Sequence, residues 1–122
     1  MSKATVLIVD DEPFNIEVLE QAMEGSEYQV LTASNGKEAW EKIQSEEPDL
    51  VLLDLMMPVM DGFAVLAKIK DDSMFRNIPV IIVSAENDSK SVVKGIKQGA
   101  EDYLTKPVDP AQFLKKVKEF LG

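Results

Sequence analysis

A small set of polar residues, each at the end of an apolar run, has the side-chain types needed for phosphoryl transfer. These residues are Asp10, Asp11 and Glu12 after the first run, then Asp54, Ser84 and Lys106 after later ones. Carboxylates gathered in one pocket repel one another unless a cation is present, and oxygen-only ligands with room for water and phosphate favour Mg²⁺. A carboxylate nucleophile, a hydroxyl donor and a lysine ammonium would together complete such a site.

Short apolar runs rich in β-branched residues predict the strands that must position this set. We expect strands over residues 4–9, 30–33, 49–54, 79–83 and 100–105. Helical spacing follows each run, and Asp109, Pro110 and Gln112 supply an N-cap, a first-turn proline and a capping-box residue for the last helix. This alternation predicts an α/β fold, a single (βα)5 doubly wound parallel five-stranded sheet with the flavodoxin-like strand order 2-1-3-4-5. The carboxyl ends of parallel strands share one edge, so the polar set would meet there.

Composition removes several classes of chemistry. The chain has 122 residues, a net charge of −9, no Cys and no His. It therefore has no Ser-His-Asp triad, no thiolate nucleophile and no metal bound by His or Cys. The acidic balance disfavours direct binding to nucleic acid or to an anionic membrane, and no apolar run is long enough to span a bilayer. We expect one cytoplasmic domain over residues 1–122, with no effector domain in this chain.

Each member of the set also has a simpler structural explanation. The acids after the first run could be N-terminal acids of a helix, and Asp54 could be a turn residue. Ser84 could cap a helix, Lys106 could open a turn, and the methionines of segment 56–60 are typical of core and loop packing. What favours a site is the coincidence of four strand ends that each carry a member of one chemical set.

Four motifs occur in the chain in the order LIVDDEP, LLDLMMPVMDG, VIIVSA and YLTKP. In sequence and spacing they resemble the receiver domain of response regulators in two-component signalling, including chemotaxis receivers, over essentially the whole chain. The resemblance implies that Asp54 accepts a phosphoryl group from a sensor histidine kinase or a histidine phosphotransfer protein. It also implies that Asp11, Asp54 and the Met56 backbone carbonyl bind Mg²⁺ directly, that Asp10 assists through water, and that Mn²⁺ can substitute.

The same resemblance assigns roles around the phosphoryl group. Ser84 and Lys106 would contact its oxygens, and the peptide bond between Lys106 and Pro107 would be cis. Ser84 and Tyr103 would form the switch that reports phosphorylation to the surface of the fourth helix, fifth strand and fifth helix.

Two further side chains would flank the phosphoryl group and tune its lifetime, Met56 and Glu86. Met56 cannot hold a water by a strong hydrogen bond whereas Glu86 can, so we expect a long-lived phosphorylated state. The protein would catalyse its own phosphorylation and slow dephosphorylation without turning over a separate substrate.

Two other classes of protein share this fold or this chemistry. A flavodoxin-like module for flavin or nucleotide needs a Gly/Ser/Thr-rich phosphate loop after the first strand, where this chain is acidic. A carboxylate-nucleophile phosphatase of the haloacid dehalogenase type would place its nucleophile at Asp10 and a second acid two positions on, at Glu12. The cognate kinase, the downstream partner and the presence of a fused effector in a longer regulator stay open.

Overall fold

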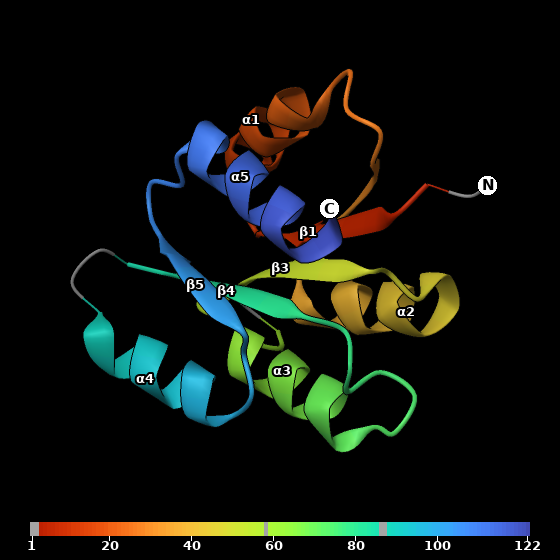
Figure 1. Ribbon diagram of the computed structural model, residues 1–122. Coiled ribbons are helices and arrows are strands. Elements are labelled where there is room, and N and C mark those ends of the chain that lie inside the picture. The colour runs from red at the N-terminus through yellow and green to blue at the C-terminus, as the bar shows by residue number, and fades with distance from the viewer. Residues whose placement is uncertain (1–2, 58, 86–87) are drawn as a thin grey trace.

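The computed structural model describes residues 3–57, 59–85 and 88–122, and a parallel sheet lies at its centre (Figure 1). The strands are β1 (Thr5–Val9), β2 (Gln29–Ala33), β3 (Leu50–Asp54), β4 (Val80–Ser84) and β5 (Asp102–Thr105). Their order in the sheet is β2-β1-β3-β4-β5, and all neighbouring pairs are parallel. The predicted fold class and strand order are confirmed.

The strand boundaries differ from the predicted ones by a residue or two. Ala4 and Pro79, predicted as first residues, each accept one backbone hydrogen bond from a neighbouring strand, at 2.9 and 3.1 Å, but lie outside the strands. Asp49 donates one at 2.8 Å to Thr5 in the same way. An apolar run marks burial, whereas a strand boundary depends on repeated pairing with a neighbour, so the two ends need not coincide.

Helices cover both faces of the sheet (Figure 1). The helices are α1 (Pro13–Met23), α2 (Gly36–Glu46), α3 (Gly62–Asp71), α4 (Ser89–Lys97) and α5 (Pro110–Leu121). Figure 1 shows α1 and α5 on one face and α2, α3 and α4 on the other. In the part of the chain that the structure describes, no helix is long and apolar enough to cross a membrane.

The two faces have separate cores because side chains alternate along each strand. Leu7 and Val9 of β1 point into the core under α2 and α3, whereas Val6 and Ile8 point into the core under α1 and α5. All four side chains are buried. Burial on both faces explains why the strands are apolar without interruption.

Side chains of residues just before the helices fix where these helices begin. Asn35, Asp61, Asp88 and Asp109 each accept a hydrogen bond from a backbone N–H in the first turn of the helix that follows. Pro110 is the first residue of α5, as predicted. Asp109 accepts from Ala111 N at 2.9 Å, and no capping-box bond from Gln112 occurs among the described residues. Each of these four helices thereby has one backbone N–H of its first turn satisfied by a side chain.

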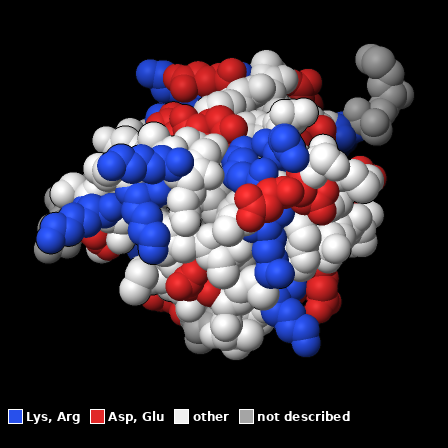
Figure 2. Space-filling model, turned by 90° about the horizontal axis from the view of Figure 1, so that it is seen from below, with Lys and Arg blue, Asp and Glu red and all other residues white. Residues whose placement is uncertain are grey.

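Charge is distributed unevenly over the fold. Residues 4–36, which contain β1, α1 and β2, hold seven acids and no base. Helix α4 holds three lysines and no acid, and Figure 2 shows lysine side chains gathered on the side of the molecule that α3 and α4 cover. The negative potential is therefore concentrated around β1 and α1, where the first three acids of the polar set lie.

Candidate functional site

Three carboxylates meet at the carboxyl edge of the sheet. Asp10 directly follows β1, Asp11 follows Asp10, and Asp54 ends β3, the strand that pairs with β1. One carboxylate oxygen from each of the three lies within 4.8 Å of the others. Asp54 is 1% exposed and Asp10 6%, whereas Asp11 is open to solvent. The group thus has two anchored acids and one accessible acid, a donor set that suits a hard divalent cation.

Both carboxylate oxygens of Asp54 accept hydrogen bonds. One accepts from the backbone N–H of Met56 at 3.1 Å, and the other from the ammonium of Lys106 at 2.8 Å. Burial raises the pKa of Asp54 above its ordinary value, and these two bonds offset only part of that effect. Ionised Asp54 is therefore a costly group in this fold, and a further positive charge beside it would stabilise it.

Lys106 faces the whole acidic group. Burial alone would lower the pKa of its ammonium, but the hydrogen bond and charge of Asp54, with the charges of Asp10 and Asp11, raise it above its ordinary value. Lys106 also donates its backbone N–H to Ser84 O at 2.8 Å, which ties the end of β5 to the end of β4. The peptide bond between Lys106 and Pro107 is cis.

The Ser84 hydroxyl has no hydrogen-bond partner among the described residues, although the side chain is only 2% exposed. Ser84 ends β4, the strand next to β3, and Val83 of β4 is paired with Asp54. A buried hydroxyl normally finds a partner, so an unpaired one beside a carboxylate and an ammonium indicates a place for a ligand oxygen.

Asp10 is held by the start of α1. One carboxylate oxygen accepts from Glu12 N at 2.9 Å, and the other from the side-chain amide of Asn15 at 3.3 Å. Glu12 is the N-cap residue, yet its side chain makes no capping bond, and it lies outside the group of three carboxylates. The structure therefore separates Glu12, an exposed acid, from the three acids that face one another.

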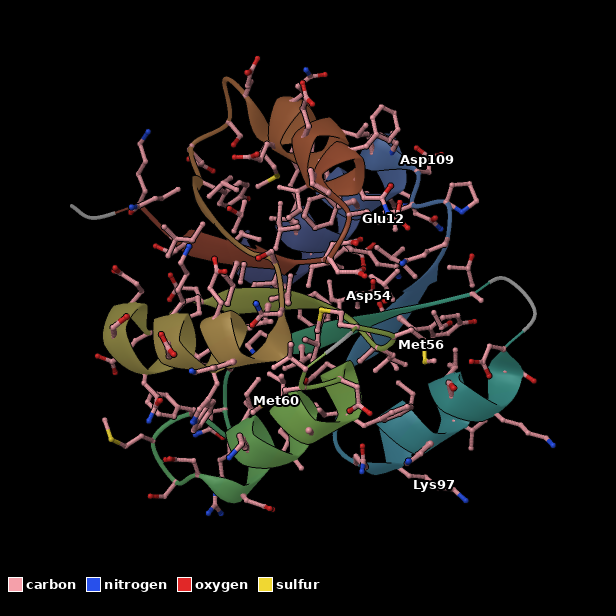
Figure 3. All side chains as sticks on the ribbon, turned by 180° about the vertical axis from the view of Figure 1, so that it is seen from behind. Glu12, Asp54, Met56, Met60, Lys97 and Asp109 are labelled. Carbon is pink, nitrogen blue, oxygen red and sulfur yellow. The ribbon has the colours of Figure 1, made fainter. Side chains whose placement is uncertain are left out.

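The three methionines of segment 56–60 have different environments. Met57 is buried and Met60 packs against the core under α2 and α3, as expected of packing residues. Met56 is 65% exposed and lies beside Asp54 at the carboxyl edge (Figure 3). Packing in the core therefore does not explain why a methionine occupies position 56.

Tyr103 lies away from the three carboxylates. It is 46% exposed and lines a cavity of about 340 Å³ with Ala85, Val93 and other residues of α4 and β5. On β5 it is paired with Ile82, two residues before Ser84. Glu86, the second predicted tuning residue, lies outside the described residues.

Sequence reasoning missed Asn15. A second, larger cavity of about 380 Å³ lies between α1 and the end of β5, and Asn15, Asp10 and Lys106 line it together with apolar residues. The signal available in the sequence was a single amide in the first turn of a helix that follows three acids. From the sequence alone, such a residue is indistinguishable from any other polar residue in the first turn of a helix, because its contact with Asp10 depends on how α1 packs.

Fold and site together define a class of protein: a doubly wound domain whose carboxyl edge brings together three carboxylates, a lysine ammonium and a buried hydroxyl that lacks a partner within the described ranges. Residues 6–118 match the family model of the response regulator receiver domain. The chain belongs to this family.

Individual relatives agree with the family match. The chain is 41% identical over 119 residues to the protein PilH of Pseudomonas aeruginosa, covering 98% of both. It is 40% identical over 115 residues to the response regulator PleD of Caulobacter vibrioides, covering 94% of this chain and 25% of PleD. The solved structure of the chemotaxis response regulator CheY4 of Vibrio cholerae superposes with a TM-score of 0.89 at 30% identity, covering 98% of this chain and 99% of that one.

Family membership places the chain in a class of signalling domains. Receiver domains take part in phosphorylation-based signalling rather than turning over a separate substrate, and response regulators interact with histidine kinases or phosphotransfer proteins. The match favours a receiver over the flavodoxin-like and phosphatase alternatives. The chain spans about a quarter of PleD and about half of several other curated relatives.

Proposed function

We propose that this protein is a phosphorylation-dependent switch that accepts a phosphoryl group on Asp54 with the help of Mg²⁺. One observation carries the proposal: a buried carboxylate, bonded to a lysine ammonium, stands among two further carboxylates and near a buried hydroxyl that has no partner in the described part of the chain. The donor would be a sensor histidine kinase or a histidine phosphotransfer protein.

The residues present fit a divalent cation. Asp10, Asp11 and Asp54 offer only oxygen atoms, and their mutual repulsion is relieved by a cation of high charge. Asp11, Asp54 and the backbone carbonyl of Met56 would hold Mg²⁺ directly, and Asp10 would hold it through water; Mn²⁺ would substitute. Bound there, Mg²⁺ would offset the negative charge that Asp54 and the phosphoryl group bring together in the transition state.

The protein's own residues would then position and stabilise the transfer. A carboxylate oxygen of Asp54 forms a bond to phosphorus while the bond from phosphorus to the donor nitrogen breaks and its electron pair leaves with that nitrogen. Met56 N–H would keep its hold on one Asp54 oxygen during the transfer. Lys106 would move from Asp54 to a phosphoryl oxygen, and the Ser84 hydroxyl would donate to another.

The change at Ser84 would be transmitted to the surface through β4 and β5. Lys106 N–H is bonded to Ser84 O, so a shift of either residue toward the phosphoryl group moves the ends of both strands. Tyr103 on β5 and the cavity it lines between α4 and β5 would be the readout. A downstream partner would bind at this surface. Met56 and Glu86 would set the lifetime of the phosphorylated state.

The decisive experiment is labelling with acetyl phosphate, followed by intact-mass spectrometry. We expect wild type to gain one phosphoryl group per chain only when Mg²⁺ is present, and Asp54→Ala to gain none. Asp71→Ala is the matched control, because Asp71 is an exposed acid at the last residue of α3, and it should label like wild type. Equal labelling of Asp54→Ala, or continuous release of phosphate from acetyl phosphate without an adduct, would contradict the proposal.

A further inference from the structure

Asp10 differs from Asp54 in the kind of group that donates hydrogen bonds to it. Asp54 is bonded to a cation, Lys106, whereas both donors to Asp10 are neutral: the Glu12 backbone N–H and the Asn15 side-chain amide. Among the described residues Asn15 is the only side chain that donates to Asp10. A lysine or arginine in its place would bring a positive charge that repels a metal ion, but an amide does not.

The two hydrogen bonds fix how Asp10 is turned. A carboxylate can accept about four hydrogen bonds, two on each oxygen. One donor on each oxygen of Asp10 holds the plane of the group and leaves further lone pairs free on both oxygens. One Asp10 oxygen lies within 4.8 Å of oxygens from Asp11 and Asp54, so a free lone pair of that oxygen is available beside the place where a cation and its water would be.

The first turn of α1 positions Asn15. Asn15 is the third residue of α1, whose N-cap Glu12 makes no side-chain capping bond, and Asp10 accepts the Glu12 N–H instead. Asp10 and the first turn of α1 therefore fix each other. Apart from Asn15, the α1 residues that line the cavity beside it, Phe14, Val18 and Leu19, are apolar and supply no alternative donor to Asp10.

We propose that Asn15 is a positioning residue that holds the Asp10 carboxylate toward the cation site and thereby sets the affinity for Mg²⁺. This inference rests on the proposed function, since it concerns the same cation. Donors that orient the ligands of a metal site typically change metal affinity by roughly 10- to 100-fold when they are removed. Because Asp10 would act through water, we expect the low end, a dissociation constant for Mg²⁺ raised roughly tenfold in Asn15→Leu.

The experiment is isothermal titration of Mg²⁺ into wild type, Asn15→Leu, Asn15→Ala and Asn15→Gln, with thermal unfolding of each protein measured in EDTA. Leu keeps the approximate size of the side chain but removes the donor, and Ala serves if the Leu variant does not fold. Gln keeps an amide on a longer stem and should restore part of the affinity. Val18→Ala is the matched control: it removes contacts from the same cavity wall, so it should lower the unfolding temperature without changing Mg²⁺ affinity.

The outcomes distinguish the positioning role of Asn15 from the proposed function of the whole site. Weaker Mg²⁺ binding in Asn15→Leu and Asn15→Ala, with partial recovery in Asn15→Gln, supports the positioning role. Wild-type affinity in the variants that lack the amide, or an equal loss in Val18→Ala, overturns it and leaves the proposed function intact. Absence of Mg²⁺ binding in wild type overturns the proposed function itself, and the role of Asn15 with it.

Discussion

Gly62 is the residue whose replacement tests most directly how the fold positions Asp54. Gly62 begins α3, and its N–H donates to Leu55 O at 3.0 Å. A Cβ atom on Gly62 would overlap the backbone carbonyl oxygen of Asp54 and would lie 2.6 Å from Leu55 Cα. These neighbours are backbone atoms, so they cannot rotate away as a flexible side chain would. The glycine is required by close approach of α3 to the end of β3, rather than by an unusual backbone angle.

The size of the effect follows from that overlap. Ordinary contact with a Cβ begins at 3.4 Å, so Leu55 Cα alone would have to retreat by about 0.8 Å in Gly62→Ala. Overpacking of this kind costs about 1–3 kcal/mol, which lowers the unfolding temperature of a domain this size by about 4 °C per kcal/mol. A displacement near 1 Å of a reacting group can reduce a rate by about 100-fold. We therefore expect Gly62→Ala to fold but to label with acetyl phosphate at least about tenfold more slowly.

Gly25→Ala is the matched control for this test. Gly25 lies after α1 with a φ of +77° and has no atom within 4 Å of the place where a Cβ would be. Its replacement should cost about 1–2 kcal/mol through backbone strain alone and should leave the labelling rate unchanged. Labelling would be followed by intact-mass spectrometry at a temperature where all three proteins are folded. A wild-type rate in Gly62→Ala, or an equal loss in Gly25→Ala, would refute the reasoning.

Three further predictions concern the phosphoryl site itself. Lys106→Ala should still bind Mg²⁺, because the acids hold the metal, but beryllofluoride should no longer perturb the NMR signals of Tyr103; a full response would contradict the role of Lys106. Met56→Asn places an amide at the exposed position beside Asp54, where it can orient an attacking water. The phosphorylated state should then decay about tenfold faster in Mg²⁺ buffer, the effect of roughly one good hydrogen bond in the transition state, and unchanged decay would rule Met56 out as the tuning residue. Asp54→Asn should unfold at a higher temperature than wild type in EDTA at neutral pH, because burial raises the pKa of Asp54 and its charge therefore costs stability. The difference should shrink as the pH falls through that raised pKa, where wild type becomes protonated, and a less stable Asn variant at neutral pH would show that the Lys106 ion pair outweighs burial.

The sequence predicted the sheet well because the physical cause of its pattern is local. Parallel strands covered on both faces must be apolar throughout. A continuous apolar run such as Val51 to Leu53 therefore indicates a buried strand. Once the strands are known, the rule that ligands bind beyond their carboxyl ends indicates the edge where Asp54, Ser84 and Lys106 are found. The roles of these residues in phosphoryl transfer stay predictions for the labelling experiments.

What the sequence could not predict depends on how α1 and the loops pack. Glu12 and Asp11 are adjacent acids that periodicity does not distinguish, and only the resemblance to receiver domains separated them. In the structure Asp11 faces the other carboxylates, whereas Glu12 is the N-cap residue of α1. Asn15 reaches Asp10 only because the first turn of α1 lies over the end of β1. The exposure of Met56 depends in the same way on the path of the loop after β3. Neighbours in the chain do not determine these positions, so periodicity and spacing carry no signal for them.

The features that make the site reactive are also features that make it unstable without a ligand. Ionised Asp54 is disfavoured by burial, and the Ser84 hydroxyl is buried without a partner among the described residues. A ligand can shift a conformational equilibrium only by its difference in affinity for the two states. A cation and a phosphoryl group would relieve both costs together, because one would neutralise the acids while the other would supply a partner for Ser84 and Lys106. The free energy released at this edge would then be available to reposition β4 and β5, as the proposed readout at Tyr103 requires.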